Sequence, residues 1–139
     1  MGGFQCAGVA GWPRIAAPVR LVGGVLALWL AWVAVVQARM GSQRFPGKML
    51  AKLGDRELLS WVLTRVCDAK QIDQVVLATS HGLDDDQLAD AASSFNALVV
   101  RGSQDDVLDR FVQSAKISQA DLVVRVCADN PFVAAEEID

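Results

Sequence analysis

The architecture of this chain follows from one segment, Val33-Ala34-Val35-Val36-Gln37-Ala38-Arg39-Met40-Gly41-Ser42-Gln43-Arg44-Phe45-Pro46-Gly47-Lys48. Its first five residues form a short, mostly β-branched run, which predicts a strand over Val33–Gln37 that is buried on both faces of a sheet. The loop behind this strand carries three cationic side chains, a serine hydroxyl and two glycines. Ligands of open α/β sheets bind at the carboxyl ends of strands, and a positive loop in a chain of formal net charge −3 indicates an anion. A nucleoside triphosphate is the first candidate.

Helical spacing of apolar residues follows this segment. It predicts an amphipathic helix over Glu57–Ala69. A second helix is expected over Asp84–Ser94, with acidic residues at the end where the helix dipole favours them. Ser103–Asp106 has the pattern of a capping box, which predicts a third helix behind it, and a last helix is expected to begin at Ala134. The apolar side of the third helix is expected to carry Val107, Leu108, Phe111, Val112 and Ala115.

Strands are expected between these helices, over Gln74–Ala78, Ala97–Val100 and Asp121–Cys127, with a loop at Thr79–Gly82 after the first of them. Strand–helix–strand repeats with short connections require right-handed crossovers. The sequence therefore predicts an α/β fold of three layers, with a mainly parallel sheet between helices on both faces.

Composition limits the class of protein. The chain has 139 residues, enough for one domain with a sizeable core, and 53% of them are hydrophobic. No block of basic residues is present, which argues against a nucleic-acid partner. Cys6, Cys67 and Cys127 are odd in number and match neither a zinc pattern nor a disulfide framework, so we expect reduced, mostly buried thiols in a cytoplasmic protein.

Residues 1–32 form an apolar extension without a periodic pattern, and three interpretations of it stay open. The eighteen uncharged residues Leu21–Ala38 barely reach the roughly 30 Å of a bilayer core, which allows a membrane anchor. Arg14 and Arg20 ahead of an apolar stretch allow a signal peptide. We favour the third interpretation, an extension joined to a strand that begins at Val33, because this strand leaves too few apolar residues to span a membrane.

The cationic loop has the chemistry of a polyphosphate site. Gly41 and Gly47 allow backbone N–H groups to approach a ligand closely, and Arg39, Arg44 and Lys48 supply charges that persist at any working pH. The alternative is a solvated surface loop. It is not a Walker phosphate loop, because five residues rather than four separate the two glycines.

A second constellation follows the last strand, in Arg125-Val126-Cys127-Ala128-Asp129-Asn130-Pro131. Alternate residues of a strand point to one side, so Arg125 and Asp129 are expected on one face near the strand end. An arginine inside a sheet needs an anionic partner. Asp129 is well placed to hold Mg²⁺ together with ligand phosphates, and the alternative is that it caps the turn before Pro131.

Other polar residues have simpler explanations. The capping box accounts for Ser103 and Asp106, which leaves Arg101 and Gly102 available to face a nucleotide. The lone His81 is expected to be solvated. Asp84–Asp86 is interpreted as a charged helix start rather than as a metal site.

Four segments of the chain, in this order, closely resemble the cytidylyltransferase family: Val35–Lys48, Val76–Ser80, Arg101–Arg110 and Val124–Phe132. The family contains CMP-Kdo synthetase, acylneuraminate cytidylyltransferase and the spore-coat polysaccharide cytidylyltransferases. The resemblance covers residues 33–139, which correspond to the N-terminal, nucleotide-binding part of the domain. Residues 1–32 have no counterpart, and the chain is truncated at its C-terminus relative to the family.

The resemblance implies a Rossmann-like nucleotidyltransferase fold and a CTP-dependent reaction. The cytidylyl group of CTP would be transferred to a sugar or sugar acid, with Mg²⁺ and release of pyrophosphate, in cell-surface polysaccharide biosynthesis in the cytoplasm. The complete protein is expected to form a homodimer. The alternative is a non-catalytic or incomplete nucleotide-binding fragment of such an enzyme.

The resemblance also assigns roles to residues. Arg39, Lys48 and Asp129 are expected to be catalytic, with Asp129 as the metal ligand. The nucleotide-binding residues would be Gln37, Ala38, Arg39, Ser42, Arg44, Lys48, Thr79, Ser80, Arg101 and Arg125.

Overall fold

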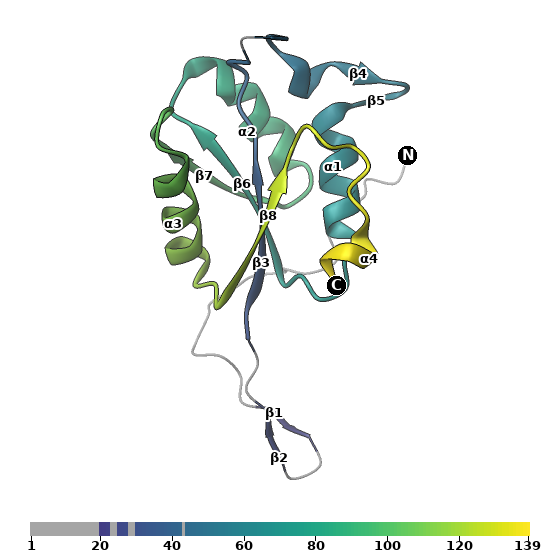
Figure 1. Cartoon of the computed structure of the whole chain (residues 1–139), viewed down its shortest axis with the longest axis vertical. Helices are drawn as coiled ribbons and strands as arrows, with labels where there is room; N and C mark the ends of the chain where they lie inside the picture. Colours follow the sequence, from purple (N-terminus) through teal and green to yellow (C-terminus); the bar gives the residue numbers. More distant parts are fainter. Residues whose placement is uncertain (1–19, 23–24, 28–29, 43) are drawn as a thin grey trace.

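The computed structural model describes residues 20–22, 25–27, 30–42 and 44–139. Its centre is a four-stranded sheet in the order β7-β6-β3-β8, in which every neighbouring pair is parallel (Figure 1). The predicted parallel sheet is therefore confirmed. Its strands are β3 (Trp32–Gln37), β6 (Gln74–Ser80), β7 (Leu98–Gly102) and β8 (Leu122–Cys127).

Helices cover both faces of this sheet. Ala34 and Val36 of β3 pack into the larger buried cluster, together with residues of two helices, and Val33 and Val35 pack into a second cluster beside Phe111 of a third helix. Alternate residues of one strand thus contact opposite layers, which confirms the three-layer α/β fold. The helices are α1 (Leu58–Cys67), α2 (Asp86–Ser93), α3 (Val107–Ser118) and α4 (Ala135–Ile138), with short 3₁₀ helices η1 (Lys48–Leu50) and η2 (Leu83–Asp85).

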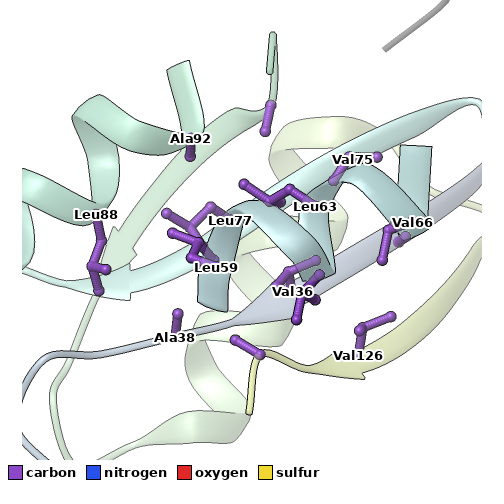
Figure 2. Packing of buried hydrophobic residues seen from close by; sticks show 14 of the residues in the cluster. Val36, Ala38, Leu59, Leu63, Val66, Val75, Leu77, Leu88, Ala92 and Val126 are labelled. Atoms are coloured by element: carbon purple, nitrogen blue, oxygen red, sulfur yellow. The ribbon is translucent and has the colours of Figure 1, made fainter. Parts of the chain in front are cut away.

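The larger cluster fixes α1 and α2 on the sheet. Leu59 and Leu63 of α1 and Leu88 of α2 meet Val36 and Leu77 of the strands, and all five side chains are fully buried (Figure 2). Complete burial of such a side chain contributes about 1.5–3 kcal/mol. These contacts hold the strand ends in place, and the strand ends in turn determine where the following loops begin.

The register of β3 with its two neighbouring strands brings the segments behind β3 and β8 together. Gln37, the last residue of β3, is opposite Cys127 of β8 on one side and Ala78 of β6 on the other. Because the strands are parallel, the loop behind β3 and the turn behind β8 leave the same end of the sheet side by side (Figure 1).

Two strands are longer than the sequence predicts. Thr79 pairs with Arg101 and Ser80 with Gly102 in the β6–β7 ladder. The predicted loop at Thr79–Gly82 is therefore wrong for its first two residues. Ladder pairing with the neighbouring strand, which periodicity does not reveal, extends both strands.

Helix α3 begins later and faces differently from its prediction. Its N-cap is Asp106, whose side chain accepts the Asp109 N–H at 2.9 Å, rather than Ser103. The predicted apolar side is wrong at Leu108 and Val112, which are 74% and 42% exposed. The helix instead buries Arg110, Ser114 and Ser118. The hydroxyls of Ser114 and Ser118 donate to carbonyls one turn earlier at 2.7 Å, so neither of these two groups is buried without a partner.

The described residues of the apolar stretch ahead of the cationic loop form strands rather than a helix. Its last part is strand β3, and β1 (Arg20–Val22) pairs antiparallel with β2 (Val25–Ala27). None of the helices within the described ranges is long and apolar enough to cross a membrane. The signal-peptide interpretation rests in part on Arg14 and on residues 23–24 and 28–29, which lie outside the described residues.

A small hairpin was not predicted. Strands β4 (Lys52–Leu53) and β5 (Arg56–Glu57) pair antiparallel. Gly54 lies between them at φ 72°, a conformation that other residues rarely adopt. This glycine is the sequence signal that marks the turn.

Among the cysteines that the structure describes, the prediction of reduced, mostly buried thiols is confirmed only for the free thiol of Cys127. This thiol is exposed rather than buried, because β8 is the last strand of the sheet on that side. Cys67 is disulfide-bonded. Cys6 lies outside the described residues.

Candidate nucleotide-binding site

A cavity of about 410 Å³ opens at the carboxyl ends of β3 and β8. The loop between β3 and η1 forms one wall, and the turn behind β8 forms the other. Met49, Cys127 and Ala128 supply part of the lining. The rest comes from eight residues predicted to belong to the site, namely Gln37, Ala38, Arg39, Ser42, Arg44, Lys48, Arg125 and Asp129.

The peptide unit of Met40 organises the cationic loop. Its carbonyl accepts the Ser42 N–H at 2.7 Å and the Gly47 N–H at 3.2 Å, which closes the loop on itself. Gly47 adopts φ 72°, so a residue with a side chain would be strained there. The closed loop presents Arg44 and Lys48 to the same cavity.

Lys48 and Asp129 join the two walls. Lys48 Nζ lies 3.1 Å from Asp129 Oδ2, and the two side chains are 29% and 56% exposed. The expectation that the basic loop and this carboxylate face each other is therefore confirmed as geometry. Their functional roles remain predictions.

Asp129 does not cap the turn that follows it. Asn130 does so instead, because its Oδ1 accepts the Phe132 N–H at 3.1 Å, while its own N–H donates to the Cys127 carbonyl at 3.2 Å. The carboxylate of Asp129 thus remains free of the turn and directed at Lys48. This geometry disfavours the purely structural interpretation of Asp129.

Arg125 has a different partner from the one predicted. Its guanidinium lies 5.5 Å from the centre of the Phe111 ring, and none of the ion pairs within the described ranges includes it. The premise that Arg125 lies inside the sheet is wrong, because it is exposed on an edge strand, where water solvates the charge and the fold requires no anionic partner from the protein. A cation–π contact is sufficient to orient it toward the cavity.

Thr79, Ser80 and Arg101 are not brought to this cavity. Thr79 and Ser80 are buried at 0% and 4% exposure. Arg101 pairs with Asp86, at 2.7 Å from its Nη1 to Oδ1, at the start of α2. The structure thus separates these three residues from the other predicted nucleotide-binding residues.

Asp85, a buried carboxylate that contacts this loop, was not among the site residues predicted from the sequence. It is 3% exposed, and it accepts hydrogen bonds from the Met40 N–H and from the N–H and hydroxyl of Ser80. Burial acts to raise its pKa, but these hydrogen bonds outweigh burial and hold the pKa below its ordinary value. A signal existed, since Asp85 stands three and seven residues before the buried Leu88 and Ala92 and so continues their face.

The charges of the cavity suit a polyanion. The residues that line it include four cations but a single carboxylate, Asp129. Within the part of the chain that the structure describes, no three His, Cys, Asp or Glu residues are grouped to hold a metal ion. A divalent ion at Asp129 would therefore need ligand oxygens to complete its coordination, as Mg²⁺ does when it binds with phosphates.

The fold and the cavity define an α/β domain with a cationic site at the carboxyl ends of parallel strands, the arrangement of nucleotide-binding proteins. The family model described as cytidylyltransferase matches residues 33–139. The chain belongs to this family.

Similarity to known proteins supports the assignment to the cytidylyltransferase family. The chain is 40% identical over 109 residues to the spore coat polysaccharide biosynthesis protein SpsF of Bacillus subtilis, covering 76% of this chain and 45% of SpsF. It is 35% identical over 108 residues to a 3-deoxy-manno-octulosonate cytidylyltransferase of Pelobacter propionicus, covering 76% of this chain and 41% of that protein. A solved cytidylyltransferase structure from Leptospira borgpetersenii superposes with a TM-score of 0.76 at 32% identity, over 80% of this chain and 47% of that one. The chain thus spans less than half the length of each.

Proposed function

We propose that residues 33–139 form the CTP-binding part of an enzyme that converts a sugar or sugar acid into its CMP derivative and releases pyrophosphate. One observation carries the proposal: in a member of the cytidylyltransferase family, a cationic loop and Asp129 face each other across a cavity at the ends of β3 and β8. The names of the Bacillus and Pelobacter relatives support a sugar-like acceptor.

The cationic side chains would act on the charge that moves during the reaction. An acceptor hydroxyl gives up its proton to water, its oxygen attacks the α-phosphorus and forms a new O–P bond, and the bond from this phosphorus to the bridging oxygen breaks. The electron pair of that bond leaves with pyrophosphate, where negative charge builds up. Arg39, Arg44 and Lys48 line the cavity where the triphosphate would lie and would stabilise this charge without being consumed.

Asp129 is the residue that we assign to Mg²⁺. Its carboxylate is more than half exposed and is the single acidic group that lines the cavity, which fits a metal completed by phosphate oxygens. When bound, the ion would neutralise phosphate charge. Lys48 would then leave its ion pair with Asp129 and contact a phosphate oxygen instead.

The wider setting is part of the same proposal. The Bacillus relative is named for spore coat polysaccharide biosynthesis, which supports a role in the assembly of cell-surface polysaccharide. We assign the reaction to the cytoplasm, and a homodimer to the complete protein.

Calorimetric titration with CTP, ATP and UTP, beside an assay for pyrophosphate release with candidate sugar acids, tests the proposal. We expect CTP to bind more tightly than the other two nucleotides, and Lys48→Ala to weaken it, whereas Lys52→Ala, on the exposed part of β4, has no effect. Equal affinity for all three nucleotides would refute the assignment of CTP. CTP binding without pyrophosphate release would favour the alternative, a non-catalytic or incomplete fragment.

A further inference from the structure

Asp85 is a buried carboxylate that lies outside the cavity and connects three segments of the fold. It ends η2, accepts from Ser80 at the end of β6, and accepts from Met40 in the loop that follows β3. The proposed reaction does not use it. Its neighbours Asp84 and Asp86 are exposed.

We propose that Asp85 is a positioning residue, which holds the Met40 peptide and thereby keeps the cationic loop in the conformation that faces the cavity. The inference rests on the proposed function for the identity of the ligand. Its physical content concerns the loop alone.

The two oxygens of Asp85 serve different segments. Oδ1 accepts the Met40 N–H at 2.7 Å, while Oδ2 accepts the Ser80 N–H at 3.1 Å and the Ser80 hydroxyl at 2.5 Å. An asparagine has one acceptor oxygen and a donor group in place of the other. Asp85→Asn therefore loses either the bond to the loop or the bonds to β6, and the amide then faces a donor.

The bond to Met40 matters because the loop closes on this same peptide. The N–H side of the residue is held by Asp85, and its carbonyl accepts from Ser42 and Gly47. Arg39 immediately precedes Met40 and, like Ser42, lines the cavity. Fixing one peptide unit thus fixes the direction in which the neighbouring side chains leave the backbone. A loop ordered in advance loses less conformational entropy when a ligand binds.

The test compares Asp85→Asn with Asp84→Asn, which removes the same charge from the adjacent exposed position. Amide hydrogen exchange is measured by NMR without ligand, and calorimetry is run with CTP and with inorganic tripolyphosphate. In Asp85→Asn we expect faster exchange at Met40 and Gly47, and a Kd for both probes that is higher by about tenfold. Asp84→Asn should match the wild-type protein in every measurement.

The inference would be overturned by unchanged exchange at Met40 in Asp85→Asn, or by faster exchange with unchanged affinity for tripolyphosphate. Ser80→Ala is a milder variant that keeps the bond to Met40, so its Met40 exchange should stay at the wild-type rate. Should Asp85→Asn fail to fold, amide exchange in the wild-type protein tests the inference instead. If the Met40 amide exchanges as fast as that of the exposed Arg44, Asp85 does not hold the Met40 peptide and the inference is overturned.

The experiment separates this inference from the proposed function. Wild-type protein that binds tripolyphosphate but shows no preference for CTP would refute the assignment of CTP, and the comparison of variants would still judge Asp85. Equal binding of CTP by wild type and Asp85→Asn would refute the positioning role alone.

Discussion

Lys48 and Asp129 make the contact on which the proposed site depends, and substitutions of the two residues should affect nucleotide binding differently. Their charged atoms are 3.1 Å apart, and Asp129 is 56% exposed. Coulomb's law gives about 1.3 kcal/mol for such a pair in water, and exposed pairs contribute about 0.2–1 kcal/mol net. Breaking the pair should therefore lower the free energy of unfolding by about 1 kcal/mol at most.

Binding should respond more strongly than stability. Lys48→Ala removes a charge-assisted contact to phosphate of about 1.5–3 kcal/mol, so the Kd for CTP should rise about 10- to 150-fold. Asp129→Asn leaves Lys48 in place and removes the carboxylate that competes with phosphate for it. Without Mg²⁺, the affinity of this variant should therefore rise about 1.4- to 5-fold, the equivalent of the exposed ion pair. With Mg²⁺ it should fall below that of wild type, because the carboxylate assigned to the metal is missing.

Calorimetry with CTP at moderate salt, once with Mg²⁺ and once with a chelator, measures both signs, and urea denaturation measures stability. Lys52→Ala and Asp90→Asn are matched controls, since both residues are exposed and neither lines the cavity. Weaker CTP binding by Asp129→Asn in the chelator, or a response to Mg²⁺ equal to that of wild type, would refute the reasoning.

Three further predictions concern the rest of the fold. A Cβ at Gly102 would lie 2.8 Å from Cγ of Arg110, whose side chain is 1% exposed and cannot move aside. Gly102→Ala should therefore lower the free energy of unfolding, measured by urea denaturation, by about 1–3 kcal/mol. Gly41→Ala, with its nearest contact at 3.9 Å, is the control, and an equal loss in both variants would contradict the packing argument. Alkylation of Cys127, mapped by peptide mass spectrometry, should slow about tenfold at a CTP concentration of ten times the Kd; an unchanged rate would place the nucleotide elsewhere. Because the pKa of Asp85 is lowered on folding, its stabilising effect is present above the ordinary carboxyl pKa and is lost as pH falls through the folded value. In Asp85→Asn the free energy of unfolding should therefore decrease less at acid pH than it does in the wild-type protein. An equal decrease in both proteins would contradict the lowered pKa of Asp85.

The sequence was sufficient for the parts of the site that depend on strand direction. The apolar run Val33–Gln37 predicts a strand buried on both faces, and the burial of β3 confirms it. Parallel strands end at the same edge of a sheet, so the position of Asp129 opposite the basic loop followed once Asp121–Cys127 was identified as a strand. Direction and register alone set this part of the geometry.

Residues whose surroundings come from distant segments were not predictable in the same way. Arg110 is a charged residue in a helix, and its burial depends on the space that Gly102 leaves and on the carbonyls of Ser103 and Gln104. The partner of Arg125 was misjudged because periodicity does not say which strand lies at the edge. In both cases the tertiary partner, rather than the local pattern, decides burial.

The charge of the cavity favours polyanions as a class, but it does not account for the proposed selectivity for CTP. Four cations and one carboxylate give its lining a formal charge of +3 in a chain of net charge −3, so triphosphates as a class are attracted. Any nucleoside triphosphate offers the same phosphates, so the proposed preference for CTP would have to come from groups that contact the base. Among the residues that line the cavity, Gln37 and Ser42 have uncharged side chains that both donate and accept strong hydrogen bonds. Gln37 ends a strand held on both sides, whereas Ser42 belongs to the loop, so the rigid sheet is better suited to distinguish bases and the loop to grip phosphate.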